Sequence, residues 1–328
     1  MSRTRWLLVL AAVCAVVLTG CSGAEEGADA ATPQPLLLTP SDGDVFTTES
    51  TLDQTIEMTI MGQTVEIMQT IQENTEWRVG TESSDGTVDV QVTTTRFQLT
   101  QEGPDSFEQY DSDDPDAVPQ SDLAVRMAAL ANVPVRMRIT PTGEITITGG
   151  MDALYNNMAD LSGAQSRTER DSIRAYFRNA FPTEELAQEY ESDLPAYTSE
   201  PVAPGSTWTV HATTSFLAPI RFDGSMRLDS LTGHRAFISG RGDVQSVPVD
   251  SVSGSINGPF QDVDLSGTRT VSSALHRRTG FPIRRTVEQR VSGDGVIRSG
   301  GGDLKAQVTL TSTISQTANV QSPSEAIP

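Results

Sequence analysis

Apolar and polar residues alternate with a period of two along most of this chain, which restricts it to strands that bury one face. Ile56, Met58 and Ile60 show the alternation near its beginning. The other predicted strands lie near residues 65–79, 88–99, 133–139, 145–147, 208–216, 220–228, 263–275, 281–291 and 304–314. Thr, Ser, Arg and Gln fill the opposite phase, as in antiparallel sheets with one face in water. We therefore predict a mainly β (α+β) fold, a curved antiparallel sheet or open half-barrel of about ten strands.

Turn signals separate these strands. Gly62, in the stretch Met-Gly-Gln-Thr at 61–64, predicts a β-hairpin. The apolar phase changes between Val92 and Phe97, which indicates a β-bulge near residues 93–96. Thr-Pro-Thr-Gly at 140–143 carries Pro and Gly where a type I turn prefers them.

A helical period replaces the alternation over residues 151–195. Met151, Leu154 and Met158 recur at helical spacing, so they define an apolar stripe. Thr183 precedes two glutamates and is the predicted N-cap of a later helix, and Pro195 ends that helix. We expect this helical insert to cover one face of the sheet.

Residues 103–120 break the strand pattern with Gly, Pro and aspartates. Asp-Ser-Asp-Asp-Pro-Asp at 111–116 has the acidity of a calcium loop. It lacks the Gly and the distal bidentate Glu of the EF-hand. We predict a solvated loop, and cation binding by the acidic 105–116 loop is the alternative.

The N-terminus has the layout of a signal peptide. Arg3 and Arg5 precede an apolar run from Trp6 to Leu18, and small residues lead to Cys21. Leu-Thr-Gly-Cys resembles the bacterial lipoprotein signal, whose pattern is an aliphatic residue, two small residues and Cys. The resemblance implies cleavage before Cys21, a diacylglycerol on its sulfur and an acyl chain such as palmitate on its new N-terminus. The alternative is an ordinary secretory signal peptide with a Cys near its cleavage site.

The lipoprotein signal also predicts location. Ser22 follows Cys21 where Asp would retain a lipoprotein in the inner membrane, so we expect the outer membrane. Glu25 and Glu26 resemble the acidic segments of some cell-surface lipoproteins, which leaves the periplasmic face and the cell surface both open. The predicted organisation is a signal peptide at 1–20, a flexible tether at 21–35, a β-rich domain at 36–316 with its helical insert at 151–195, and a disordered tail at 317–328.

Acidic residues dominate the charge. The chain has 23 Lys and Arg against 43 Asp and Glu, and Lys305 is its one lysine. Removing the signal peptide with Arg3 and Arg5 gives a net charge of 21 − 43 = −22. This charge argues against binding to nucleic acid and against direct adhesion to anionic lipid headgroups. Solubility in salt is one explanation of the acidity, and cation binding is the other.

Catalytic motifs are missing from the sequence. His211, His234 and His276 have no second His within four residues, so they form no local zinc motif. Cys14 lies in the signal peptide and the anchor consumes Cys21, which leaves no thiol in the mature fold. The sequence also lacks a Gly-x-Ser-x-Gly elbow and a phosphate-binding Gly-Lys-Ser/Thr loop. We therefore predict no catalytic residues, no cofactor, no metal ligands and no enzyme activity.

Two arginine pairs flank one predicted hairpin. Arg277 and Arg278 precede its turn, and Arg284 and Arg285 follow it. Guanidinium groups bind phosphate oxygens, so these pairs are candidates to meet a lipid or glycan phosphate. The alternative is that they offset the surrounding acids.

Several short motifs together resemble a family of bacterial envelope lipoproteins that is classed only as a domain of unknown function. The resemblance covers residues 36–316, and it implies an envelope location and a β-rich architecture but no activity. The motifs that carry it are Met-Gly-Gln at 61–63, Tyr-Asp-Ser at 110–112, Thr-Pro-Thr-Gly-Glu at 140–144, Gly-Ser-Thr-Trp at 205–208 and Thr-Gly-Phe-Pro at 279–282.

The order of a β-half, a helical insert and a second β-half is similar to the open half-barrels of lipoprotein carriers. This resemblance implies an apolar groove that binds a lipid or another amphiphilic ligand, and we expect Met58, Val90, Ile145 and Phe222 to line it. The alternative function is a structural or interaction lipoprotein whose acidic surface binds an envelope partner or cations. Its protein partners cannot be named from the sequence.

Overall fold

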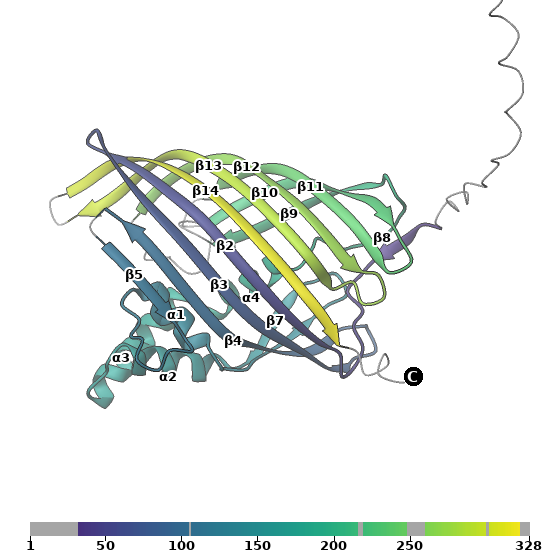
Figure 1. The fold of residues 1–328 in the computed structure, drawn as a ribbon, viewed down its shortest axis with the longest axis horizontal. Coiled ribbons are helices and arrows are strands. Elements are labelled where there is room, and N and C mark those ends of the chain that lie inside the picture. The colour runs from purple at the N-terminus through teal and green to yellow at the C-terminus, as the bar shows by residue number, and fades with distance from the viewer. Residues whose placement is uncertain (1–31, 105, 216–218, 248–259, 300–301, 322–328) are drawn as a thin grey trace, which may run out of the picture. The chain divides into compact units, whose positions relative to one another are not determined.

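Twelve strands form one antiparallel sheet in the computed structural model, which describes residues 32–104, 106–215, 219–247, 260–299 and 302–321 (Figure 1). The strands are β2 (Val45–Ile60), β3 (Gln63–Glu82), β4 (Val88–Gly103), β5 (Ser106–Asp111), β6 (Val135–Ile139), β7 (Ile145–Gly149), β9 (Thr207–Ser215), β10 (Pro219–Leu231), β11 (Arg235–Ser246), β12 (Phe260–His276), β13 (Pro282–Ser299) and β14 (Gly302–Gln321). Their order across the sheet is β7-β6-β4-β3-β2-β14-β13-β12-β11-β10-β9, and β5 pairs with β4. The last strand, β14, therefore lies beside β2 and joins the two β-rich halves of the chain.

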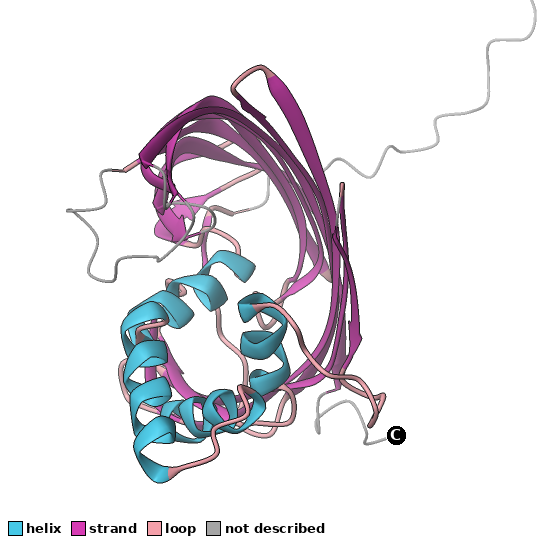
Figure 2. Ribbon diagram, turned by 90° about the vertical axis from the view of Figure 1, so that its left-hand side faces the viewer, coloured by secondary structure: helices cyan, strands magenta, loops and turns pink. Residues whose placement is uncertain are grey.

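Two short strands and four helices complete the described part. β1 (Gln34–Leu36) pairs with β8 (Thr198–Val202). Ser121 and Ser166 each cap a helix by accepting a hydrogen bond from the backbone N–H three residues later. The helices lie together on the concave side of the curved strands (Figure 2), and they are α1 (Asp122–Leu130), α2 (Met151–Leu161), α3 (Arg167–Ala180) and α4 (Thr183–Asp193).

Helix α4 connects the two edges of the sheet. It contacts both β7 and β9, the first and last strands of the order. On the β7 side, the Glu191 carboxylate accepts a hydrogen bond of 2.7 Å from the backbone N–H of Ile145. On the β9 side, Trp208 Nε1 donates to the carbonyl of Ala196, just beyond α4, at 3.2 Å. The sheet is not closed into a barrel, and α4 lies in the gap between its edges.

The largest apolar cluster joins the helices to one half of the sheet. The rings of Phe46 and Phe281 stack with their centroids 4.0 Å apart. Trp77 meets Phe281 edge-on at 5.7 Å and meets Tyr190 of α4 at the same distance. The cluster also contains buried residues of all four helices, so the predicted role of the helices as a cover for the sheet is confirmed.

A second apolar cluster consists of strand residues alone, and we call it the strand-only cluster. It belongs to β10–β14 and β2, and no residue of the described helices contributes to it. Its buried members are Ile56, Ile220, Phe222, Val244, Leu265, Val291, Ala306, Val308 and Leu310. The inner face of the sheet therefore has a helix-covered half and a half that the described helices leave uncovered.

Two predicted turns meet at the same place. The backbone N–H of Leu38 donates to the carbonyl of Pro141 at 2.9 Å, and that of Thr39 donates to the carbonyl of Thr279 at 2.8 Å. Gly280 has a φ of 71°, which favours glycine. The turns at 140–143 and 279–280 thus hold the segment that enters β2.

The mainly β, half-barrel fold is confirmed, and so are its local turn signals. Met61 and Gly62 form the hairpin turn with φ values of 52° and 81°, as a type I′ turn requires. Thr95 lies at the predicted bulge, because Thr94 pairs with Thr75 while Arg96 pairs with Asn74.

Other local predictions were wrong. Helix α1 was not predicted, although Ser121 followed by the acidic Asp122 is a helix-start signal. It treated 103–120 as a loop, but Ser106–Asp111 forms β5 against β4. Thr183 is the first residue of α4 rather than its cap, which is Pro182. The last strand, predicted near residues 304–314, continues to Gln321, because Val45 of β2 pairs with it. Residues 317–321 therefore belong to β14 and not to the predicted disordered tail at 317–328.

Replacing Phe281 with Ala should cost about 3–5 kcal/mol of the free energy of unfolding, because its ring stacks on Phe46 inside the largest cluster. Urea denaturation of residues 33–328, which form one compact unit, measures this loss. Phe107→Ala is the control, since this ring on β5 is 64% exposed and its removal should change stability by less than about 0.5 kcal/mol. Equal losses in the two variants would contradict the packing described above.

Candidate ligand-binding site

A row of polar residues crosses the inner face of the sheet. The strand register aligns Ser273, Arg285 and Gln316 across β12, β13 and β14, and the row continues through Ser50 of β2 to Glu73 of β3. Residues that oppose each other directly share a face of the sheet. Ser273, Arg285 and Gln316 are all buried. We call this line the first polar row.

A second polar row lies four residues away along the strands. Arg269 of β12 begins it, opposite Gln289 of β13, and the row passes through Gln54 and Gln69 to Gln101. Gln54 donates to the side chain of Gln69, whose Nε2 donates to Gln101 Oε1 at 3.0 Å. An apolar row separates the two polar rows, and it contains Val271, Val287, Ile314, Leu52 and Ile71.

Buried polar atoms in these rows lack hydrogen-bond partners. Arg285 is 4% exposed, and its Nε and Nη1 have none. Arg269 is 8% exposed, and its Nε has none. Ser273 Oγ and Gln316 Oε1 are also buried and have no hydrogen-bond partner. Buried donors without an acceptor cost free energy, so each requires an explanation.

The second arginine adjoins the strand-only cluster. The guanidinium carbon of Arg269 lies 5.7 Å from the ring centroid of Phe222. Two glycines make room for this ring on the sheet surface. A Cβ atom at Gly224 would lie 2.4 Å from the ring, and one at Gly242 would lie 2.6 Å from it. The polar rows and the strand-only cluster therefore meet at Phe222.

Asp193 is the acidic residue whose charge acts on both arginines, and it forms no close ion pair with either. Burial raises the pKa of Asp193 at the end of α4 to about 7, although the charges of Arg285 and Arg269 oppose this rise. Burial also raises the pKa of Glu73, which accepts a hydrogen bond of 2.7 Å from Thr94. No ion pair joins Arg269 or Arg285 to an acid among the described residues.

Both buried arginines carry a positive charge near pH 7. Burial lowers the pKa of Arg269 to about 10, so it stays protonated. Arg285 is also buried and its pKa is lowered, but a guanidinium loses its proton only at high pH. Asp193 titrates near neutrality and offsets only part of that charge. The chain as a whole carries −20, so the two buried guanidinium groups are opposite in sign to its net charge.

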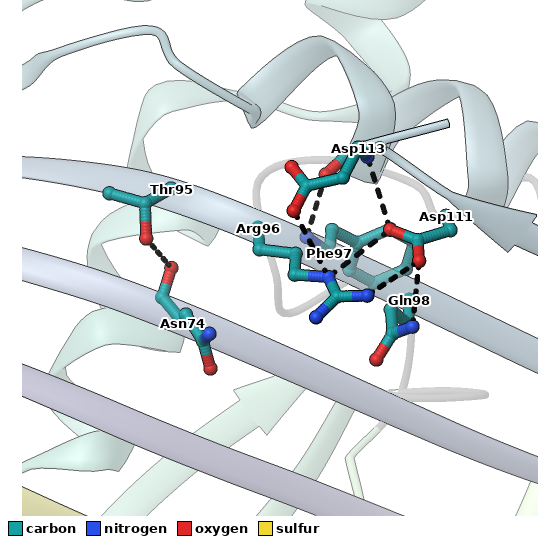
Figure 3. A network of polar contacts seen from close by, with 8 residues as sticks. Asn74, Thr95, Arg96, Phe97, Gln98, Asp111 and Asp113 are labelled. Atoms are coloured by element: carbon teal, nitrogen blue, oxygen red, sulfur yellow. Dashed lines mark hydrogen bonds and ion pairs between the residues drawn. The ribbon is translucent and has the colours of Figure 1, made fainter. Parts of the chain in front are cut away.

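The acidic loop forms a local ion-pair network instead of a calcium site (Figure 3). Arg96 of β4 donates to Asp111 at 2.7 Å and lies 3.3 Å from Asp113. Gln98 donates to Asp111 at 2.8 Å. The hydrogen bond from Arg96 is the main cause that lowers the pKa of Asp111 to about 2. In the described part of the chain, no three His, Cys, Asp or Glu residues are placed to hold a metal ion.

Two of the three histidines lie on strands and one lies in a turn. His211 is exposed on β9, with Nδ1 2.6 Å from Asp223 Oδ1. His234 is exposed in the turn between β10 and β11. Nδ1 of His276 lies 3.1 Å from Thr279 Oγ1 at the end of β12.

Two further hollows lie outside the polar rows. A groove of about 960 Å³ is lined by residues of β4, β6, β7 and helices α2, α3 and α4, including Arg136, Tyr155 and Arg178. Arg178 is paired with Asp152 at 2.8 Å, so the groove carries charges of both signs. A smaller pocket of about 260 Å³ lies between the β1 segment and the end of β12.

The four residues predicted to line one groove lie in two different apolar clusters of the described part. Val90 and Ile145 are buried in the helix-covered cluster, whereas Phe222 and Met58 belong to the strand-only cluster. Cys21, the predicted lipid anchor, lies outside the described residues. No helix in the described ranges has both the length and the apolar content to cross a bilayer.

The arginines had a signal in the sequence. The predicted apolar phase of β13 contains Phe281, Val287 and Val291, and Arg285 shares that phase. Arg269 shares the phase of Val271 on β12. A charged residue in the buried phase marks a buried charge. Arg285 was predicted as half of a pair that meets a lipid or glycan phosphate or offsets the surrounding acids, whereas Arg269, Asp193 and Glu73 were not predicted.

Comparison with known protein families shows the family to which the chain belongs. A model described as a family of unknown function (DUF6263) matches residues 85–282, which is more than half of the sequence. The chain belongs to that family. This confirms the predicted resemblance to a family of unknown function, and the match covers the helical insert and the turn at 279–282. No curated protein matches the chain.

Solved structures show only distant likeness. A structure reporting lipid–protein interactions in lipovitellin aligns with 9% identity and a TM-score of 0.47 over 86% of this chain, which spans only 26% of the lipovitellin chain. The outer membrane protein OprG from Pseudomonas aeruginosa aligns with 6% identity and a TM-score of 0.25, covering 85% of this chain and 96% of that one. A putative outer membrane lipoprotein-sorting protein domain from Vibrio parahaemolyticus aligns with 6% identity and a TM-score of 0.14, covering 85% of each chain. These scores are too low to support an argument about function.

Replacing Asp193 with Asn should remove part of the pH dependence of stability. Because the folded pKa of about 7 lies above the usual 3.8, the wild type loses stability as pH rises between these values. The neutral amide of the variant has no such cost, so at pH 8 Asp193→Asn should be more stable than the wild type by at least about 1 kcal/mol, and nearly equal to it at pH 4.

Urea denaturation of residues 33–328 across this pH range measures the difference. Asp294→Asn on β13 is the control, because Asp294 is exposed. A variant that is less stable than the wild type at pH 8 would show that ionised Asp193 stabilises the arginines more than its burial costs.

Proposed function

We propose that this protein is a membrane-anchored bacterial envelope lipoprotein that binds a hydrophobic or amphiphilic ligand on the inner face of its sheet and catalyses no reaction. The anchor is the lipid on Cys21, and the location is the outer membrane, at its periplasmic face or at the cell surface. The observation that supports binding is the pair of buried arginines with unpartnered N–H groups beside the strand-only cluster.

The architecture supports a ligand inside the sheet. The helices cover one half of the inner face, and α4 bridges the sheet edges. The other half holds an apolar cluster from the strands, and its partly buried members still expose apolar surface. A ligand that covers this surface gains about 25 cal/mol per Å². These members are Met58, Ile60, Ile67, Val210 and Val263.

The absence of catalysis is part of the proposal. The sequence lacks the nucleophile and phosphate-binding motifs named above, and the residues that converge on the inner face are arginines, glutamines and carboxyls with raised pKa values. This set is suited to holding a polar group beside an apolar surface.

A second candidate function is interaction with an envelope partner through the acidic outer surface. The exposed ring of Phe107 on β5 and the exposed Val118 favour it, because they lie next to the acidic segment 111–116. On this alternative, the inner face would only stabilise the fold.

The ligand proposal predicts that lipid co-purifies with the protein. Residues 33–328 form one compact unit, so they can be exported to a bacterial periplasm without the anchor. Mass spectrometry of an organic extract should then reveal about one equivalent of a lipid class per chain. A clean extract from protein with the circular dichroism of a folded β-rich domain would contradict a tight lipid site and favour the interaction role.

The anchor proposal has its own test. The full chain expressed in a bacterium should partition into the detergent phase of Triton X-114, because acylation of Cys21 adds buried methylene groups at about 0.8 kcal/mol each. Cys21→Ser should move the protein to the aqueous phase. Cys14→Ser is the control, since Cys14 precedes the predicted cleavage site and should not change the partition. Detergent partition of Cys21→Ser equal to that of the wild type would contradict the anchor.

A further inference from the structure

The unpartnered atoms on the inner face limit the chemistry of the ligand's head group. Arg285 presents two donor nitrogens without acceptors, and Arg269 presents one. Guanidinium groups donate and never accept hydrogen bonds. The group that completes them must therefore supply acceptor oxygens.

Charge narrows the choice further. Arg285 and Arg269 lie close enough to interact electrostatically, since the charge of Arg285 contributes to lowering the pKa of Arg269. Asp193 is the carboxyl that influences both of them, and burial keeps it partly protonated near pH 7. An anionic head group would supply the missing negative charge, whereas a cationic head group would be repelled.

Building on the proposed function, we infer that the ligand is an amphiphile with one anionic head group, a carboxylate or a phosphate, which Arg285 and Arg269 bind on the inner face. Its apolar chain lies along the strand-only cluster. The fold determines the direction in which the ligand's apolar chain extends from the arginines. Phe46, Trp77 and the helices already fill the inner face on the side of the first polar row that lies away from the strand-only cluster.

The head and chain regions are continuous. Arg269 contacts Phe222, and Phe222 belongs to the strand-only cluster with Val244 of the neighbouring strand β11. Gly224 and Gly242 keep the sheet surface beside Arg269 free of other side chains, so the Phe222 ring occupies that position. A ligand held by Arg269 therefore meets apolar surface immediately beyond its head group.

Three probes with the same C18 chain test the head group: oleate, monoolein and oleylamine, which are anionic, neutral and cationic. Each is titrated below its critical micelle concentration against residues 33–328 loaded with the neutral fluorophore N-phenyl-1-naphthylamine. Oleate should displace the fluorophore at a concentration at least about tenfold lower than monoolein, and oleylamine should be the weakest. Acetate, which is a carboxylate without a chain, should not displace it at the concentrations at which oleate does.

Substitutions then assign the selectivity to the two arginines. Arg285→Gln and Arg269→Gln should each weaken oleate binding at least about tenfold and leave monoolein binding nearly unchanged. Arg284→Gln is the matched control, because Arg284 is the neighbouring residue of β13 and is exposed. Circular dichroism shows whether the Gln variants fold. If they do not, Arg285→Lys tests the site, because it keeps the positive charge. This variant should retain the preference for oleate over monoolein.

The outcomes separate this inference from the proposed function. Displacement by none of the three C18 probes would overturn the proposed function itself. Equal displacement by oleate and monoolein, or unchanged oleate binding in Arg285→Gln and Arg269→Gln, would leave amphiphile binding intact and overturn the anionic head group. If acetate displaced the fluorophore as strongly as oleate does, the inference that an apolar chain contributes to binding would be wrong.

Discussion

The burial of guanidinium groups among apolar strands is the constraint on which this account depends. A buried charge is tolerated when hydrogen bonds and opposite charge compensate its loss of water. Arg285 and Arg269 have incomplete compensation from the described residues, since three of their nitrogens have no acceptor. A fold that needed only stability would gain more from apolar residues at these two positions. Their presence therefore supports the proposed anionic ligand.

On this proposal, the sheet topology determines where the anionic head group binds. Pairing between β14 and β2 brings the N-terminal and C-terminal β-rich halves into one sheet, and α4 bridges its edge strands β7 and β9. The helices fill the half of the inner face next to β3 and β4, which leaves the strand-only cluster on the other half. The two polar rows run between these apolar regions. An amphiphile matches this spatial order of polar and apolar surfaces along the inner face, whereas a fully polar or a fully apolar ligand would not.

Local sequence patterns predicted the fold better than they predicted the site. Alternation at residues such as Ile56 and Val88 defines strands because the side-chain period of a strand is two, and Met61-Gly62 defines its hairpin for the same local reason. The pairing of β14 with β2 and the bridging by α4 depend on contacts far apart in sequence, so no local pattern contains them. Arg285 was visible as a charge in a buried phase, but Asp193 meets it only through the packing of α4 against the sheet.

A crystal structure of residues 33–328 with 9,10-dibromostearate tests the central claim most directly, because bromine gives an anomalous signal and the fatty acid carries one carboxylate. We expect the bromine atoms against the strand-only cluster near Val291 and Leu310, with a carboxylate oxygen within hydrogen-bond distance, about 2.7–2.9 Å, of Arg285 or Arg269. Bromine atoms in the groove beside α2, or on the outer face, would contradict the account. So would a bound chain whose carboxylate lies in solvent, away from both arginines.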